Sequence, residues 1–290
     1  MLGILLVVKP LGISSHDVVN VIRRRFGTKR VGHAGTLDPL ATGVLVVAVG
    51  PATRFLQYLP LEPKRYIAEI GFGKETETYD REGAVVSESE VPSDLGDRIG
   101  SIREQFLGLV QQIPPMFSAV KVGGRRLYTY ARNGQQVARD PRTVHISRFD
   151  ILEVHGTHVR ALIECSGGTY VRTFAHDLGH KIGCGAHLTG LVREGVGRFT
   201  LQDTVPLHEA SPTNLVPLSQ ALLPMPIFKL TEDETHHVRE GRQIRIDVEP
   251  GNMPIALCDP HGVVFSVARL LGNAVQPECV IPDGAILEPI

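Results

Sequence analysis

The feature of this sequence that most constrains the fold is a short stretch of glycine, acid and imidazole that runs directly into an apolar segment. Residues 30–43 read Arg-Val-Gly-His-Ala-Gly-Thr-Leu-Asp-Pro-Leu-Ala-Thr-Gly, and residues 44–49 read Val-Leu-Val-Val-Ala-Val. A short β-branched run bounded by glycines, here Gly43 and Gly50, predicts a buried strand. The stretch before it is therefore expected to be a loop that enters a buried strand.

Asp38 is the residue of this loop whose chemistry is most restricted. Pro39 moves the residue before it toward extended backbone, so Asp38 is expected outside any helix. Its carboxylate could form an Asx turn that bonds only its own backbone. However, His33 and Arg30 share the loop with Asp38, and the glycines around them permit close approach by a ligand. This combination favours a functional site.

Residues 32–43, Gly-His-Ala-Gly-Thr-Leu-Asp-Pro-Leu-Ala-Thr-Gly, resemble the signature of the TruB-type tRNA pseudouridine synthases. That family isomerises uridine 55 in the T arm of tRNA. The resemblance implies that Asp38 is the catalytic nucleophile, and that His33 stacks or hydrogen-bonds where the base departs. Residues 9–15, Lys-Pro-Leu-Gly-Ile-Ser-Ser, are similar to the family's first motif. Further motifs follow in the family's order, so the resemblance covers nearly the whole chain.

Tyr66 lies in a segment, residues 64–73, whose apolar residues alternate as in a strand. On this pattern Tyr66 shares an inward face with Ala68 and Ile70. An inward tyrosine is usually a core residue with a satisfied hydroxyl. The Lys-Arg-Tyr triplet at 64–66 matches the family's second motif, and the resemblance implies instead that Tyr66 stacks on the target base. It would also lie close enough to accept a proton.

Residues 166–179 are expected to open a helix capped by Ser166 or Thr169, with Tyr170 and Arg172 in or beside its first turn. An arginine is poorly placed for the dipole at a helix N-terminus, so an acidic partner is expected. That partner could be a surface glutamate or Asp38, because a buried carboxylate needs a hydrogen-bonded cation to stay ionised. The family's Gly-Thr-Tyr-x-Arg motif implies the pairing with Asp38, and it places Tyr170 beneath the base.

Two further segments match the family but allow more than one interpretation. Leu191 would be an ordinary core residue on sequence alone, whereas the resemblance implies that it walls the base pocket. The family block usually has two arginines after that leucine, and this chain has Val192-Arg193. In the polar loop at 74–83, Asp80 fits either a turn residue or a residue that organises the loop, and no catalytic role is assigned to it.

An insertion is predicted at about residues 111–141. Gly123-Gly124 indicates a hairpin turn, and a short helix with Tyr128 and Tyr130 is expected after it. An ordinary hairpin would account for this pattern. Arginines beside a flexible Gly-Gly, with tyrosines nearby, also suit a mobile insertion that grips RNA, and the Pro-Pro-x-x-Ser-Ala-x-Lys run resembles the family's T-loop insertion.

Composition adds limits to these interpretations. The 290 residues are 42% hydrophobic, enough for a large core and a second small domain. The formal net charge of -1 gives no support for RNA binding, although local cationic clusters such as residues 23–25 can suffice. The four cysteines show no metal-ligand spacing, so free thiols in a reducing cytosol are expected. The apolar N-terminus, residues 1–8, is too short for a membrane span and predicts a first strand.

Local signals predict most other elements. A first helix is expected to begin at Ser14 or Ser15 and to end at Gly27, and a capped amphipathic helix fits residues 93–107. Residues 205–225 are proline-rich and are expected to be connective. After them, a helix at 231–241 and strands at 253–258 and 263–270 indicate a small β domain, which matches the family's PUA-like barrel only weakly.

These observations predict an α+β chain with the pseudouridine synthase fold, a mixed and mainly antiparallel sheet flanked by helices. The catalytic domain is expected at 1–212 and a PUA-like RNA-binding domain at 226–290. The expected function is isomerisation of uridine 55 without cofactor or metal, by a cytoplasmic monomer that binds the tRNA T stem-loop, with no membrane and no obligatory protein partner. The alternatives are a guide-RNA-dependent relative, a non-catalytic RNA-binding or RNA-folding protein, and a glycosidase, which would need a second paired carboxylate.

Overall fold

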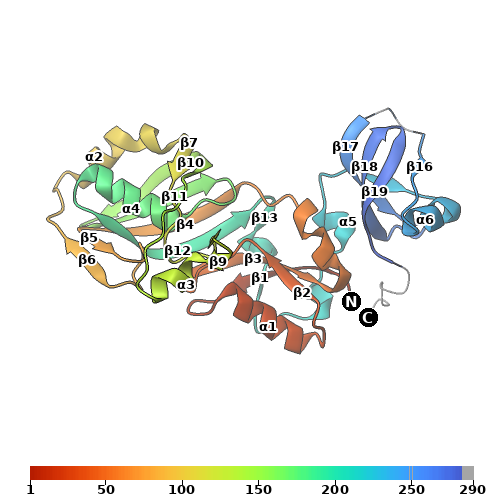
Figure 1. Ribbon diagram of the computed structural model, residues 1–290, viewed down its shortest axis with the longest axis horizontal. Coiled ribbons are helices and arrows are strands. Elements are labelled where there is room, and N and C mark those ends of the chain that lie inside the picture. Colours follow the sequence, from red (N-terminus) through yellow and green to blue (C-terminus); the bar gives the residue numbers. More distant parts are fainter. Residues whose placement is uncertain (248, 250, 283–290) are drawn as a thin grey trace. The chain divides into compact units, whose positions relative to one another are not determined.

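The computed structural model describes residues 1–247, 249 and 251–282, and the chain divides into two compact units (Figure 1). Unit 1 comprises Met1–Pro39, Gly43–Leu61 and Arg198–Ile290, and unit 2 comprises Leu40–Thr42 and Glu62–Gly197. The predicted end of the catalytic domain at residue 212 and the predicted start of the PUA-like domain at residue 226 remain predictions. Positions 248, 250 and 283–290 of the predicted PUA-like domain lie outside the described residues.

The N-terminal part of unit 1 is built on two central strands, as the apolar runs predicted. β1 (Gly3–Lys9) pairs antiparallel with β3 (Ala41–Val49). The helix α1 (Ser15–Arg25) packs Val18, Val19 and Ile22 into the same core. Its predicted start is confirmed, because Ser14 forms a capping box with Asp17: the Asp17 N–H donates to Ser14 Oγ at 3.1 Å, and the Ser14 N–H donates to Asp17 Oδ2 at 2.9 Å.

Two segments expected to be irregular are strands. The sequence predicts a loop throughout 30–43, but β2 (Val31–Ala34) pairs antiparallel with β3, with His33 opposite Val47. Similarly, β14 (Val205–Pro206) in the proline-rich stretch pairs parallel with β1. Both are short and derive their stability from hydrogen bonds to a long buried neighbour, which local sequence patterns do not reveal.

After β3 the chain forms a 3₁₀ helix, η1 (Gly50–Tyr58). Gly50 adopts a φ of +65°, and a Cβ there would lie 2.1 Å from the Met1 carbonyl oxygen. Only glycine fits this junction, which explains the glycine that bounds the apolar run.

Unit 2 is an antiparallel sheet with the strand order β12-β4-β11-β10-β7. The helices α4 (Val171–Ile182) and α2 (Leu95–Ile102) lie along this sheet (Figure 1). Phe174 of α4 packs edge-on against Phe106 and Phe149, with ring centroids 5.3 and 4.8 Å away. The strands are β12 (Ala186–Val196), β4 (Lys64–Phe72), β11 (His158–Cys165), β10 (Arg142–His155) and β7 (Gly108–Gln112).

The helix predicted at 93–107 is shorter and has no side-chain cap. It comprises α2 (Leu95–Ile102) followed by the 3₁₀ turn η2 (Arg103–Phe106). Asp94 occupies the cap position, but its carboxylate forms an ion pair with Arg98 at 2.8 Å and makes no cap hydrogen bond. The competing partner explains why the cap predicted from sequence is absent.

The remaining part of unit 2 consists of two small hairpins. β5 (Lys74–Thr76) pairs with β6 (Val85–Glu88), and the predicted hairpin at Gly123-Gly124 joins β8 (Lys121–Val122) to β9 (Arg125–Arg126). α3 (Leu127–Arg132) follows, as expected for the insertion.

The C-terminal part of unit 1 holds a curled five-stranded sheet in the order β15-β17-β18-β19-β16, as expected for a PUA-like domain. The predicted strands are confirmed, and Thr231 caps the predicted helix. Between these strands the Val263 N–H donates to Asp259 Oδ1 at 2.9 Å and closes a turn. The elements from residue 199 are β13 (Phe199–Thr200), η3 (Leu201–Asp203), η4 (Pro212–Asn214), α5 (Leu218–Ala221), β15 (Ile227–Lys229), α6 (Glu232–Arg239), β16 (Ile244–Arg245), β17 (Gly251–Cys258), β18 (Val264–Gly272) and β19 (Ala274–Val280).

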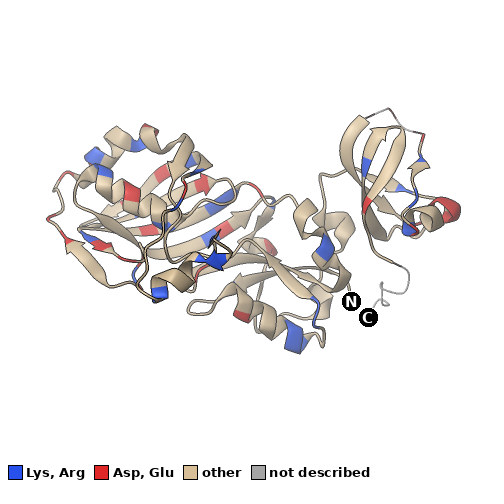
Figure 2. Cartoon of the chain, viewed as in Figure 1, with Lys and Arg blue, Asp and Glu red and all other residues tan. Residues whose placement is uncertain are grey.

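Charge is spread over both units rather than gathered in one field (Figure 2). Cations occupy the last turn of α1 and the strand β9. All four cysteines are buried free thiols, as predicted. In the described part of the chain, no helix is long and apolar enough to cross a membrane.

Candidate functional site

Asp38 lies in a loop whose backbone is fixed on both sides. The preceding residue, Leu37, is buried, and its N–H donates to Ser15 Oγ at 2.8 Å while its carbonyl accepts from the same hydroxyl at 3.1 Å. The following residue, Pro39, accepts from the Gly12 N–H at 2.8 Å. Asp38 itself is partly exposed and non-helical, as predicted. The carboxylate is therefore presented from a rigid loop rather than a mobile one.

The segment at 9–15 supplies this brace, and a buried lysine shapes it. Lys9 is fully buried, and its ammonium donates to the carbonyls of Pro10 at 2.8 Å and Ile13 at 2.6 Å. These bonds fold the turn that brings Gly12 and Ser15 against the Asp38 loop. The family-like opening motif thus has a physical role that its sequence did not reveal.

His33 lies on β2, not on a loop as the sequence predicts, and its side chain is partly buried. Four of the other predicted site residues belong to unit 2. Tyr66, on β4, is 6% exposed and confirms the predicted inward face. Leu191, 9% exposed, is opposite Ala68 in the β12–β4 register. Tyr66 and Ala68 are two residues apart on one strand, so Leu191 and Tyr66 share one face of the sheet.

Arg172, in the first turn of α4, is buried and has several partners in unit 2. Its Nη1 lies 3.3 Å from Asp80 Oδ2 and donates to the Thr78 carbonyl at 3.0 Å, and its Nη2 donates to the Phe117 carbonyl at 3.1 Å. Both side chains of the ion pair are about 5% exposed. Asp80 is thus an acidic partner of the kind that an arginine at a helix N-terminus requires. From the sequence, Asp80 is predicted only to be a turn residue or to organise the loop.

Asp80 is held as firmly as the arginine it faces. Its Oδ1 accepts from Thr78 Oγ1 at 2.6 Å and from the Glu82 N–H at 3.0 Å, and its carbonyl accepts from Thr76 Oγ1 at 2.6 Å. The loop also docks on β12, where Asp80 bridges to Leu188. A signal was present in the sequence: α4 carries an arginine and no acid in its first turn, so a partner from elsewhere was required.

Tyr170 occupies the N-cap of α4, in place of the Ser166 or Thr169 predicted. Thr169 Oγ1 donates back to the Ser166 carbonyl at 2.9 Å and is unavailable as a cap. The Gln112 amide instead holds the backbone of the N-cap residue: its Oε1 accepts from the Tyr170 N–H at 2.9 Å, and its Nε2 donates to the Tyr170 carbonyl at 3.2 Å. Gln112 fixes the backbone from which the partly buried Tyr170 ring projects.

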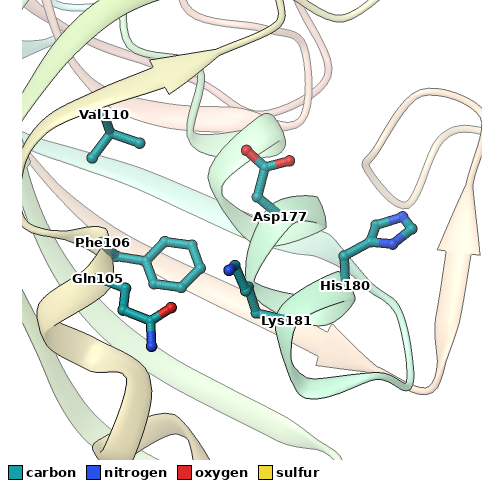
Figure 3. Close-up of a pocket in the computed structure, with 6 residues that line it drawn as sticks. All are labelled: Gln105, Phe106, Val110, Asp177, His180 and Lys181. Atoms are coloured by element: carbon teal, nitrogen blue, oxygen red, sulfur yellow. The ribbon is translucent and has the colours of Figure 1, made fainter.

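A hollow of about 500 Å³ lies on another side of α4 and contains none of the predicted site residues (Figure 3). Burial raises the pKa of Asp177 in this hollow to about 6, and the nearby His180 partly opposes the shift. Figure 3 shows the His180 ring pointing away from Asp177. The hollow is lined by Gln105, Phe106, Val110, Asp177, His180 and Lys181.

Comparisons with known proteins place the chain in a family. The family model described as "TruB family pseudouridylate synthase (N terminal domain)" matches residues 23–171. The model described as "tRNA pseudouridylate synthase B C-terminal domain" matches residues 172–225. The chain belongs to the TruB family of pseudouridylate synthases. The resemblance seen in the sequence motifs is thereby confirmed, and the family is one of isomerases.

The chain is similar along nearly its full length to TruB relatives named tRNA pseudouridine synthase B. One from Caldanaerobacter subterraneus is 37% identical, and the match covers 95% of this chain and 98% of the relative. One from Dehalococcoides mccartyi is 42% identical over 95% of this chain and 92% of the relative. Sequence similarity to TruB relatives is therefore not confined to the motifs at Asp38, Tyr66 and Arg172.

A solved structure described as a Cbf5–Nop10–Gar1 complex resembles the fold with a TM-score of 0.71, 25% identity and coverage of 97% of this chain and 85% of that one. An archaeal box H/ACA Nop10–Cbf5 complex gives a TM-score of 0.69 at 22% identity, over 99% of this chain and 89% of that one, which shows the fold alone. The predicted pseudouridine synthase fold is confirmed.

Proposed function

We propose that this TruB-family chain converts uridine 55 in the T arm of tRNA to pseudouridine, with Asp38 as the nucleophile. Its relatives support tRNA pseudouridylation. The observation that carries the proposal is the double brace around Asp38, by Ser15 on Leu37 and by Gly12 on Pro39. A turn residue with no further role does not need a loop fixed on both sides, whereas a nucleophile must be held within a fraction of an ångström of its target.

The chemistry needs few groups. Pseudouridine formation breaks the bond between C1′ and N1, turns the uracil, joins C5 to C1′ and releases the C5 proton. It involves no net oxidation, reduction or hydrolysis. The uridine must first leave the base stack and enter a pocket. A rigidly held carboxylate can then attack either C1′ of the sugar or C6 of the base.

The other predicted residues have matching roles in this proposal. Tyr66 and Tyr170 offer aromatic faces to the extruded base, and Leu191 an apolar wall. Arg172 would keep the Asp38 carboxylate ionised and aimed, and His33 would occupy the place that the base leaves. Tyr66 is the candidate acceptor for the C5 proton. Tyr66 and Leu191 share one face of the unit 2 sheet, which supports the roles of Tyr66 as an aromatic face and Leu191 as an apolar wall for the same base.

The main alternative is a guide-RNA-dependent enzyme. The two resembling solved structures described above are complexes of Cbf5 with Nop10, with or without Gar1. The relatives covered over nearly their full length are named tRNA pseudouridine synthase B, which favours direct action on tRNA. We therefore also propose a cytoplasmic monomer that needs no protein partner. A non-catalytic RNA binder would not require the fixed Asp38 loop.

Tritium release tests the proposal. Purified chain is incubated with a T-arm stem-loop whose uridines carry tritium at C5, without guide RNA or other protein. We expect release of one equivalent, mapped to uridine 55. A stem-loop with cytidine at that position is the matched control and should release none. No release from the uridine stem-loop, or release mapped to other uridines, would contradict the proposal.

A further inference from the structure

Three potential metal ligands converge on the face of unit 2 where α4 meets β5. His176 and His180 are one turn apart on α4, so their rings lie on the same side of the helix. Glu75 reaches them from β5. One ligand atom from each of the three residues lies within 4.8 Å of the other two. None of them belongs to the site proposed for RNA.

The Glu75 carboxylate is fixed before any ion binds. Its Oε1 lies 2.9 Å from His180 Nε2, and its Oε2 accepts from Ser87 Oγ at 3.0 Å. Its stem packs over Gly185, where a Cβ would lie 2.5 Å from Glu75 Cγ. Hydrogen bonding of the second carboxylate oxygen is the usual support for a ligating carboxylate. Glycine at 185 leaves the space that the glutamate occupies.

The His176 ring is also held in place. It stacks on Tyr79 with centroids 3.9 Å apart and planes 14° from parallel. Its Nδ1 is buried and has no hydrogen-bond partner within the described part of the chain.

We propose that Glu75, His176 and His180 bind a divalent transition-metal ion of the zinc type. Two imidazoles and one carboxylate are a donor set that zinc accepts in tetrahedral sites with a fourth, open position. Tetrahedral ligands at zinc distances are roughly 3.4 Å apart. Glu75 Oε1 and His180 Nε2, 2.9 Å apart, would therefore separate slightly, and ligand atoms that are up to 4.8 Å apart would close by at most about 1.4 Å. His180 is 59% exposed, so its side chain has room to move.

The ion would connect the two segments that carry the buried ion pair. α4 holds Arg172 in its first turn, and β5 leads directly into the loop that holds Asp80. Metal binding at this point clamps the helix to the loop and stabilises unit 2. This role does not depend on the proposed activity, since the readout is metal affinity.

Calorimetric titration of zinc into the tag-free, chelator-treated full chain tests the site. We expect one equivalent to bind. We expect His180→Ala and Glu75→Gln each to weaken binding at least about tenfold, the loss caused even by removing an outer partner of a ligand. The matched control is His236→Ala, since His236 and Glu240 form a similar exposed pair on α6, with Nε2 and Oε1 3.6 Å apart, but belong to no group of three potential ligands among the described residues. This control should bind like wild type.

Folding of each variant is checked by its melting temperature in chelator. If another variant is unfolded, the test uses His180→Ala alone. The His180 side chain is exposed, so its removal should leave the chain folded. Cobalt provides a second measurement: its intense visible bands report a tetrahedral site, and these should be lost in His180→Ala. Absence of stoichiometric zinc binding, wild-type affinity in His180→Ala, or loss of binding in His236→Ala would each overturn the proposal.

Discussion

Substitution of Asp80 by asparagine should destabilise unit 2 strongly. The change retains the shape of the side chain and the oxygen that accepts from Thr78 Oγ1 and the Glu82 N–H, but removes the negative charge 3.3 Å from Arg172 Nη1. Removing one partner of a buried pair costs about 3–5 kcal/mol. Arg172 keeps its bonds to two carbonyls, so we expect the lower end, about 3 kcal/mol.

The assay is thermal unfolding followed by circular dichroism at pH 7. A loss of about 3 kcal/mol lowers Tm by about 6–12 °C in a unit of this size. Asp94→Asn is the matched control, because its ion pair with Arg98 joins two side chains that are each 51% exposed and contributes at most about 1 kcal/mol. If Asp80→Asn lowers Tm no more than Asp94→Asn does, the buried pair does not stabilise unit 2 and the reasoning fails.

Three further predictions concern separate parts of the chain. Ser15→Ala leaves the buried backbone of Leu37 without its hydrogen-bond partner, at a cost in stability of about 1–3 kcal/mol. It should lower kcat for tritium release while the Kd for RNA stays within about twofold. An unchanged kcat would show that the brace is dispensable. Burial raises the pKa of Asp177 to about 6 from 3.8, so the folded state binds this proton more tightly than the unfolded chain does. Stability should therefore fall as pH rises from about 4 to about 6. Asp177→Asn should remove this dependence of Tm on pH, and parallel Tm curves for the variant and the wild type would refute the prediction. Replacing both Arg125 and Arg126 by glutamine should weaken T-arm binding and reduce the salt slope of log K by up to about 2, and an unchanged slope would show that these arginines do not contact phosphate.

Local sequence signals predicted the elements that depend on local chemistry. The helix start at Ser14 or Ser15 and the buried strand at 44–49 follow from neighbouring residues. The helix is capped at Ser14, and the strand forms as predicted. The inward position of Tyr66 follows from alternation alone. Signals of this kind suffice where the structure is decided within a few residues.

Partners that are distant in sequence account for what the sequence missed. Arg172 could be predicted to need an acid, but Asp80 lies 92 positions earlier, and only the fold brings the two together. Similarly, β2 forms because β3 is beside it, and Gln112 of β7 holds the backbone of Tyr170, the N-cap residue of α4. The identity of the site came from motif resemblance, whereas its support came from contacts that no local pattern encodes.

The most direct test of the account is the rate of pseudouridine formation by Asp38→Asn, measured by tritium release alongside the Kd for the T-arm stem-loop. The substitution conserves shape and leaves the brace from Ser15 and Gly12 intact, so RNA binding should persist. The account predicts that release falls below detection while the Kd changes less than about threefold. Release at the wild-type rate would contradict it.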